Sequence, residues 1–167
     1  MNTQSAPTPV SPTQVAQDLP RLIERMHRRY LDVVRIELAR RGFHDISPVQ
    51  AMMLGSISGE EISVRDLIER GYYLGSNASY NLKHLVDGGY VDRKSSARDR
   101  RSAQLKLSAK GREILEALAR LNVQMAENLV KTEGREMEVT QQTLRHLERR
   151  WTDAIRSEGA GSDNEDF

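Results

Sequence analysis

The chain has 167 residues, of which 38% are hydrophobic and 29% charged, with a formal net charge of +1 and no cysteine. This length is enough for one ordinary domain with a core or for two closely packed lobes. The lack of cysteine excludes disulfides, thiol redox sensing and cysteine-ligated metal sites. No apolar run approaches the roughly 18–20 residues that span a bilayer, and the N-terminus does not resemble a secretory signal. We therefore expect a cytoplasmic protein.

The N-terminal part is predicted to be a loose arm followed by a long helix. Residues 1–14 are rich in Pro, Ser, Thr and Gln and bury too little apolar surface to become ordered, so we expect a disordered arm. Apolar side chains then recur every three or four residues, which predicts an amphipathic helix over 15–41 that ends at Gly42. Pro20 is expected in the first turn of that helix, where a missing N–H is harmless.

Three short helices are predicted in the middle of the chain, each with a cap at its start and a glycine at its end. They run from Ser47 to Gly59, from Ser63 to Gly71 and from Gly75 to Gly89. Ser47 followed by proline, and Ser63 followed by an acidic residue at the third helical position, are typical helix starts. A very short strand is expected at Glu61-Ile62.

A two-stranded hairpin follows these helices. Residues 90–93 begin one strand, alternating apolar and polar residues over 103–107 predict the other, and 95–101 form the loop. Between Arg93 and Arg112 there are eight cations and one anion, which gives about +7 in this segment. Such a concentration of charge on one structural unit indicates a polyanionic partner, and DNA fits best.

Two more helices are predicted at the C-terminal end. Ser108 caps the first, which covers 109–132, and the second covers 136–157 after Gly134. Residues 158–167 are small and acidic, which is typical of a flexible tail.

Three short helices followed by a hairpin make a winged helix-turn-helix. The expected fold class is therefore mainly α with a small antiparallel β-hairpin, flanked by long N- and C-terminal helices. The second helix of a helix-turn-helix enters the major groove of DNA. Here that helix covers residues 76–88 and spans roughly 20 Å, enough to cross the groove.

The chain resembles the MarR-type transcriptional regulators over roughly residues 15–157. The resemblance rests on LVDGGYVDR at 85–93, on DRR at 99–101 and on LKLS at 105–108 with Gly111. The family often has threonine where this chain has a serine before the long helix. Within the family, the run GYYLGSNASYNLKHLV resembles regulators of L,D-transpeptidase and cell-envelope genes.

The resemblance implies a homodimer whose N- and C-terminal helices interleave. Residues 15–46 and 109–157 would form the dimerisation region, and residues 47–108 the winged helix-turn-helix DNA-binding domain. The end helices carry more apolar surface than the small DNA-reading lobe could cover, and a two-fold dimer would bury it. The dimer would also place two reading helices about 34 Å apart on a near-palindromic operator.

The reading helix is expected to turn a polar face to DNA. The candidates on that face are Ser76, Asn77, Ser79, Tyr80, Lys83 and His84. Asn77 could read adenine, Lys83 guanine or phosphate, and Tyr80 a thymine methyl or a phosphate. A face that is merely solvated is the alternative. Ser63 and Ser76, both at helix starts, could donate to phosphates or serve as caps.

The hairpin loop is expected to contact the minor groove. Arg98 and Arg100 are expected at the tip of the loop. An arginine there could enter the minor groove, where a narrow A·T tract strengthens the negative potential of the DNA. The resemblance pairs Asp99 with Arg101, so that a carboxylate orients one arginine while another enters the groove. A solvated charged loop is the alternative.

The resemblance also implies a small, often aromatic anion bound between the dimer helices and the reading lobe. The side chains placed in that region are Tyr30, His44, Met52, Met53, Tyr72 and Tyr73. Methionine and tyrosine at helical spacing equally fit an ordinary core. No cofactor is required. His27 with Glu24 could form half of a metal site, but no tight ligand spacing supports one, so no metal is predicted.

The chain shows no catalytic constellation. It has no cysteine nucleophile, G-x-S-x-G, phosphate-binding loop or H-E-x-x-H motif, so we do not expect an enzyme. The sequence instead predicts a transcriptional regulator that binds specific double-stranded DNA and responds to a small molecule. The alternatives are a winged-helix module that binds protein and a metal-responsive regulator. The operator, the sign of regulation and the effector do not follow from the sequence.

Overall fold

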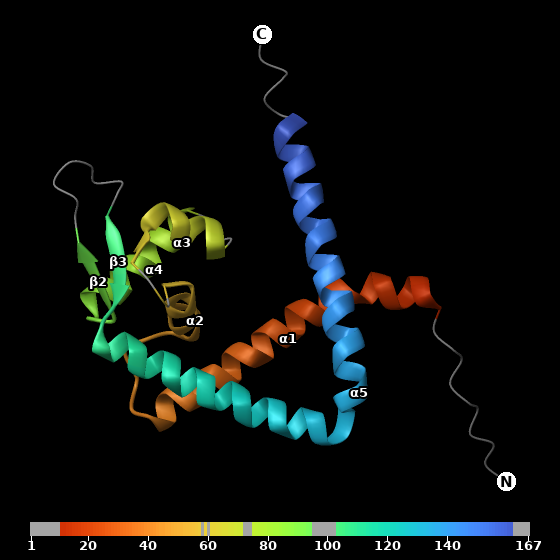
Figure 1. The fold of residues 1–167 in the computed structure, drawn as a ribbon, viewed down its shortest axis with the longest axis horizontal. Coiled ribbons are helices and arrows are strands. Elements are labelled where there is room, and N and C mark those ends of the chain that lie inside the picture. The colour runs from red at the N-terminus through yellow and green to blue at the C-terminus, as the bar shows by residue number, and fades with distance from the viewer. Residues whose placement is uncertain (1–10, 58, 60, 72–74, 95–102, 162–167) are drawn as a thin grey trace. The chain divides into compact units, whose positions relative to one another are not determined.

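The computed structural model describes residues 11–57, 59, 61–71, 75–94 and 103–161, with only the backbone described at a few helical positions. Its elements are α1 (Pro12–Arg40), α2 (Pro48–Ile57), β1 (Ile62–Ser63), α3 (Val64–Gly71), α4 (Gly75–Asp87), β2 (Val91–Lys94), β3 (Gln104–Leu107) and α5 (Ala109–Gly161) (Figure 1). They form two compact units, Met1–Ala119 and Arg120–Phe167, and α5 runs from the first into the second. Among the described helices, none combines the length and apolar character needed to cross a membrane.

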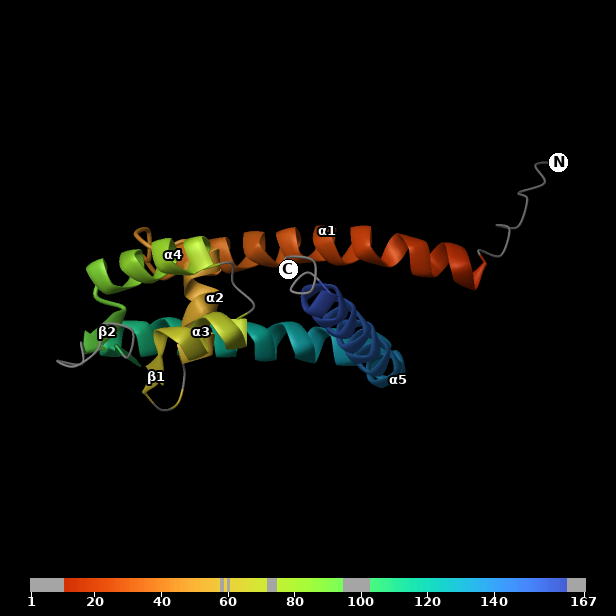
Figure 2. The ribbon, with the colours of Figure 1, turned by 90° about the horizontal axis from the view of Figure 1, so that it is seen from above.

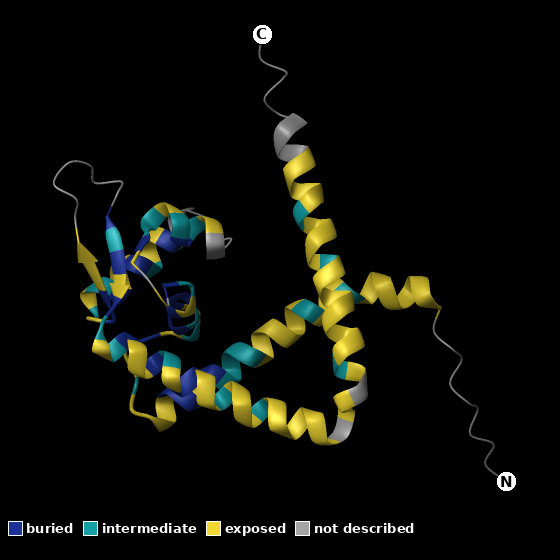
Figure 3. Ribbon diagram, in the orientation of Figure 1, coloured by how far each residue is buried: buried dark blue, intermediate teal, exposed yellow. Residues whose placement is uncertain are grey.

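The helix α2 is the centre of the first unit. Its sequence, PVQAMMLGSI, is apolar around most of its circumference, so the helix is stabilised by being buried on several sides. It contacts α1, α3, α4 and β3 (Figure 2). Buried residues of α4, β3 and the first turns of α5 complete the core, shown dark blue in Figure 3.

The three strands form an antiparallel sheet in the order β1-β3-β2. Leu105 on the central strand pairs with Ile62, and Leu107 pairs with Val91, so buried apolar residues oppose one another. Lys106, between the two leucines, is exposed. The predicted short strand is thus present as β1, and the predicted fold class, mainly helical with a small antiparallel sheet, is confirmed.

The helix α1 begins at Pro12, earlier than the sequence pattern indicated. Ser11 Oγ accepts a hydrogen bond from Gln14 N at 3.3 Å, and Gln14 Oε1 accepts one from Ser11 N at 3.1 Å, which makes a capping box. The expectation that Pro20 lies in the first turn is therefore wrong, because Pro20 lies inside the helix. Its ring leaves the carbonyl of Ala16 without its helical N–H partner.

The two predicted C-terminal helices are joined as α5, with a break where the sequence placed it. Glu133 has φ −137° and ψ 26°, which are not helical angles, and it directly precedes Gly134. The second part continues to Gly161, beyond the predicted end at residue 157.

Gly111, in the first turn of α5, lies against the backbone of Tyr90. A Cβ at this position would stand 2.2 Å from the Tyr90 carbonyl oxygen, a distance that real Cβ atoms do not reach. The Tyr90 oxygen belongs to the backbone, and a Cβ is fixed in place by its own backbone, so neither atom can move aside as a side-chain end can. Glycine is therefore required here for close approach rather than for an unusual φ.

We predict that Gly111→Ala lowers the free energy of unfolding by about 1–3 kcal/mol, as forced overpacking does. Chemical denaturation followed by circular dichroism measures this. Gly55→Ala is the matched control, because a Cβ there would meet only Leu115 Cδ2 at 4.0 Å. Equal stability of the two variants would show that the α5 start yields easily.

Candidate nucleic-acid interface

The helix α4 has one apolar and one polar face. Ala78, Leu82 and Leu85 are buried in the core. On the opposite, polar face, the predicted residues whose side chains are described are all exposed: Asn77, Ser79, Tyr80, Lys83 and His84. Tyr80 is 63% exposed, although burying its ring would stabilise the fold. The side chain of Ser76 lies outside the described residues.

Neighbouring side chains hold parts of this polar face in place. The rings of Tyr80 and His84 meet edge to face, with centroids 4.5 Å apart. Lys83 Nζ lies 3.1 Å from Asp87 Oδ2, one turn further on. The face therefore offers hydrogen-bonding groups with little net charge, which suits contacts with base edges better than neutralisation of phosphates.

The helix α4 ends in a glycine cap. Gly89 has φ +72°, in the left-handed region that favours glycine. The Tyr90 amide donates to Leu85 O at 2.8 Å and the Gly88 amide donates to His84 O at 2.9 Å, which satisfies carbonyls of the last turn. The chain is thereby reversed, and β2 starts directly after the end of α4.

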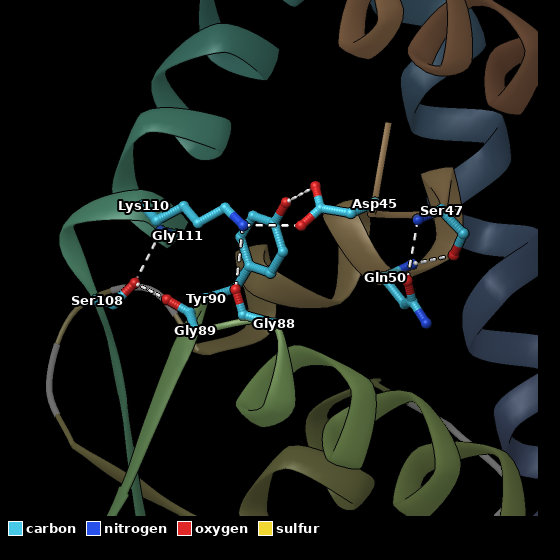
Figure 4. Close-up of polar contacts among 9 residues, drawn as sticks. All are labelled: Asp45, Ser47, Gln50, Gly88, Gly89, Tyr90, Ser108, Lys110 and Gly111. Atoms are coloured by element: carbon cyan, nitrogen blue, oxygen red, sulfur yellow. Dashed lines mark hydrogen bonds and ion pairs between the residues drawn. The ribbon is translucent and has the colours of Figure 1, made fainter. Parts of the chain in front are cut away.

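The start of α5 packs against this cap at the end of α4 (Figure 4). Ser108 Oγ donates to Gly89 O at 2.7 Å and accepts from the Gly111 amide at 3.0 Å. The Ser108 amide donates to Tyr90 O at 3.1 Å. The predicted cap at Ser108 is confirmed, and the same hydroxyl also fixes the end of α4.

A polar cluster of Asp45, Tyr90 and Lys110 lies beside this junction, as Figure 4 shows. Tyr90 Oη donates to Asp45 Oδ1 at 2.5 Å. Lys110 Nζ donates to Asp45 Oδ2 at 2.8 Å and to Gly88 O at 3.1 Å, and it lies 4.0 Å from the centroid of the Tyr90 ring. Sequence reasoning missed this cluster, because no sequence signal joins residues that are 65 positions apart.

These contacts shift the ionisation of all three groups. The hydrogen bond from Lys110, followed by that from Tyr90, holds the pKa of Asp45 below its ordinary value. The same carboxylate raises the pKa of Lys110. Burial, and then Asp45, raise the pKa of the Tyr90 phenol. A carboxylate, an ammonium and a neutral phenol therefore coexist here at neutral pH.

Residues outside the basic segment neutralise part of its charge. Glu61 Oε1 lies 3.1 Å from Lys94 Nζ and 3.9 Å from Lys106 Nζ. Asp45 pairs with Lys110. Counting these two carboxylates with the acidic residue of the loop against eight cations leaves about +5 rather than +7. The sequence count overstated the charge because it could not include carboxylates that only the fold brings near.

Ser63 acts as a helix cap. Its Oγ donates to Asp66 Oδ2 at 2.8 Å and accepts from the Asp66 amide at 3.1 Å, so the hydroxyl hydrogen is used within the helix start. The residues predicted at the tip of the hairpin loop lie outside the described residues: Arg98, Asp99, Arg100 and Arg101.

The side chains predicted to bind an effector lie in different surroundings. Met53 is fully buried in the core of the first unit, Tyr30 and Met52 are half-buried, and His44 is exposed. Tyr72 and Tyr73 lie outside the described residues. None of the four described ones lines the hollow of about 450 Å³ on α5, which is bounded by Val123, Ala126, Glu127, Val130 and Lys131.

The described residues contain no group of three His, Cys, Asp or Glu side chains placed to hold a metal ion. His27 is exposed on α1. Glu24, its suggested partner, lies 3.1 Å from Arg28 in an ion pair.

Comparison with known proteins identifies the family. A sequence model of the MarR family matches residues 44–102. The exopolysaccharide II synthesis transcriptional activator ExpG of Rhizobium meliloti (strain 1021) is 44% identical over 141 residues, which cover 83% of this chain and 73% of that protein. The chain belongs to the MarR family. Because MarR-family members are transcriptional regulators, the predictions of a regulator and of a chain that is not an enzyme are confirmed.

Solved MarR-type structures share the fold. Streptococcus pneumoniae FabT in complex with DNA is 24% identical with a TM-score of 0.67, and the match covers 83% of this chain and 99% of that one. Staphylococcus aureus MarR in complex with salicylate and kanamycin is 19% identical with a TM-score of 0.67, covering 85% and 93%. At these identities the likeness establishes the winged-helix fold.

The pairing of Glu61 with two lysines generates a prediction for the MarR-type hairpin. Glu61→Gln removes the negative charge beside Lys94 and Lys106, so affinity for random-sequence duplex DNA should rise about three- to tenfold at low salt. Fluorescence anisotropy titration measures the change. Glu24→Gln is the matched control, since it breaks an ion pair on α1. Equal affinities for the two variants would mean that Glu61 does not restrain the lysines.

Proposed function

We propose that this regulator binds double-stranded DNA as a homodimer and reads a near-palindromic operator with α4. The observation that carries the proposal is the exposed polar face of α4, which stands on a buried apolar face beside a basic hairpin. A helix held in this way can enter the major groove while the hairpin approaches the backbone. The DNA complex of FabT, which has the same fold, supports this reading.

We propose two groups of DNA contacts. Base contacts come from the polar face of α4: Ser76, Asn77, Ser79, Tyr80, Lys83 and His84. Contacts with phosphates and the minor groove come from the hairpin loop, where Asp99 pairs with Arg101 and Arg98 and Arg100 lie at the tip. The engaged hydroxyl of Ser63 favours a capping role over a phosphate contact.

A homodimer is proposed from apolar surface that one chain leaves uncovered. Of α1, only Val34, Glu37 and Leu38 are buried, although its apolar stripe begins near the N-terminal end. No residue between 120 and 157 whose burial is described is buried, and Leu129, Val130 and Trp151 are exposed there. Helices with such stripes require a partner surface. We assign residues 15–46 and 109–157 to dimerisation and 47–108 to DNA binding.

We propose that a small aromatic anion modulates DNA binding. The complex of Staphylococcus aureus MarR with salicylate supports this proposal by fold alone. The half-buried Tyr30 and Met52, with the exposed His44, are the better described candidates, since Met53 is committed to the core. No cofactor is needed for this role.

We propose target genes from the similarity to ExpG. ExpG is named as an activator of exopolysaccharide II synthesis, so genes for cell-surface polysaccharide or envelope are the proposed targets. Selection of bound fragments from genomic DNA tests this function. The expected fragments share two half-sites one helical turn apart and lie beside such genes. Fragments without a common sequence would contradict operator recognition.

Asn77→Ala is expected to weaken binding to the selected operator by about five- to 150-fold and to leave random DNA within about twofold. One lost bidentate base contact costs about 1–3 kcal/mol. Competition titration gives both affinities. Gln17→Ala, which truncates an exposed amide on α1, is the control. Equal losses on operator and random DNA would place Asn77 on the backbone instead.

Met26→Glu is expected to raise the dimer dissociation constant about a hundredfold or more. Met26 is 55% exposed in the single chain and lies on the apolar stripe of α1. Burial of a methionine contributes about 1.5–3 kcal/mol, and two-fold symmetry counts it twice. Sedimentation equilibrium measures the constant. Gln17→Glu, on the opposite side of α1, should leave it unchanged. A wild-type chain that is monomeric at micromolar concentration would refute the dimer.

A further inference from the structure

We propose that Lys110 is a positioning residue for the reading helix: from the first turn of α5 it fixes the end of α4, and it thereby sets how the polar face of α4 meets base edges. This inference rests on the proposed DNA binding and assigns a role to a lysine that the charge pattern alone would give to phosphate.

The Lys110 ammonium contacts the backbone at the end of α4. Lys110 Nζ donates to the carbonyl of Gly88, the residue just after α4, at 3.1 Å. The last carbonyls of a helix lack N–H partners within the helix and carry its negative dipole end. Lys110 therefore satisfies the C-terminus of α4, as a capping residue would, but from a different helix.

Lys110 is itself held in place by Asp45 and Tyr90. Its ammonium also binds Asp45 Oδ2 at 2.8 Å and lies over the Tyr90 ring, and Tyr90 Oη binds the other oxygen of Asp45. Tyr90 is buried, so the ring cannot turn away without opening the core. Two of the three ammonium hydrogens are donated to Asp45 and Gly88, so most of the bonding capacity of Lys110 is used within the fold rather than for a phosphate.

The cluster of Asp45, Tyr90 and Lys110 joins three parts of the chain. Asp45 lies in the connection between α1 and α2, and Lys110 lies at the start of α5, which we assign to the dimerisation region. Gly88 and Tyr90 belong to the end of the reading helix. The contacts of Lys110 therefore connect the helices that set the spacing of two half-sites with the helix that reads each of them.

The consequence for binding is selective. Hydrogen bonds to base edges need distances of about 2.7–3.2 Å and good alignment, so they fail when a helix tilts slightly. Long lysine and arginine side chains follow a displaced phosphate more easily, and their attraction carries no sequence information. A loosened α4 should lose discrimination between sequences before it loses affinity for DNA in general.

Lys110→Met in the full-length chain tests this inference, because methionine keeps the length of the side chain and removes its charge and donors. Affinity for the selected operator should fall about tenfold or more, while random duplex DNA stays within about twofold with the same salt slope. Hydrogen exchange without DNA should become at least about tenfold faster at the amides of Gly88 and Tyr90. Lys110→Arg should restore part of both properties.

Lys106→Met is the matched control, since Lys106 is an exposed lysine on β3. It should weaken operator and random DNA alike and leave exchange at the end of α4 unchanged. If Lys110→Met unfolds at the working temperature, Asp45→Asn keeps the lysine and tests the same exchange.

An equal loss on both DNAs with a salt slope smaller by about one would make Lys110 a phosphate contact and overturn the inference. Unchanged exchange at the end of α4 would overturn it as well. A wild-type protein that does not discriminate between DNAs would refute the proposed function instead, and the exchange measurement would still decide whether Lys110 fixes the helix.

Discussion

The close approach of α5 to the end of α4 is the constraint on which the rest of the structure depends. Gly89 supplies the left-handed turn, Gly111 leaves room for the Tyr90 carbonyl, and Ser108 binds both glycines through one hydroxyl. The helix α4, the strand β2 and the long helix α5 are therefore joined within a few residues. Because each of these contacts involves backbone, the angle between α4 and α5 is set by atoms that cannot adjust as a flexible side chain can.

The positive charge and the side chains proposed to recognise DNA sequence lie on different elements of the first unit. The hairpin segment keeps about +5 after its pairing with Glu61 and Asp45, which is ample for attraction to a polyanion. The polar face of α4 carries almost no net charge, because Lys83 forms an ion pair with Asp87. We infer that affinity comes mainly from the hairpin and discrimination mainly from α4. A regulator built this way can bind DNA of any sequence through the hairpin and recognise its operator through α4.

Much of the fold could be predicted from local sequence, because its signals act over a few residues. Serine caps, glycine stops and apolar spacing located the helices, and alternation located β3. The start of α1 was missed, since the Ser11–Gln14 capping box lies in a segment too polar to suggest order. Contacts distant in sequence were not predictable: Asp45 with Lys110, and Glu61 with Lys94 and Lys106. Periodicity shows that a residue faces inward, but it does not show which partner meets it.

The central claim is that one part of the molecule supplies attraction to DNA and another supplies choice of sequence. The most direct test is to measure wild-type affinity for the selected operator and for random duplex DNA as a function of salt. Roughly 6–10 phosphate contacts per dimer predict that both affinities fall by about 10³–10⁵ between about 50 and 200 mM salt, with their ratio nearly constant. Affinities that do not respond to salt would contradict the account and favour a winged-helix module that binds protein.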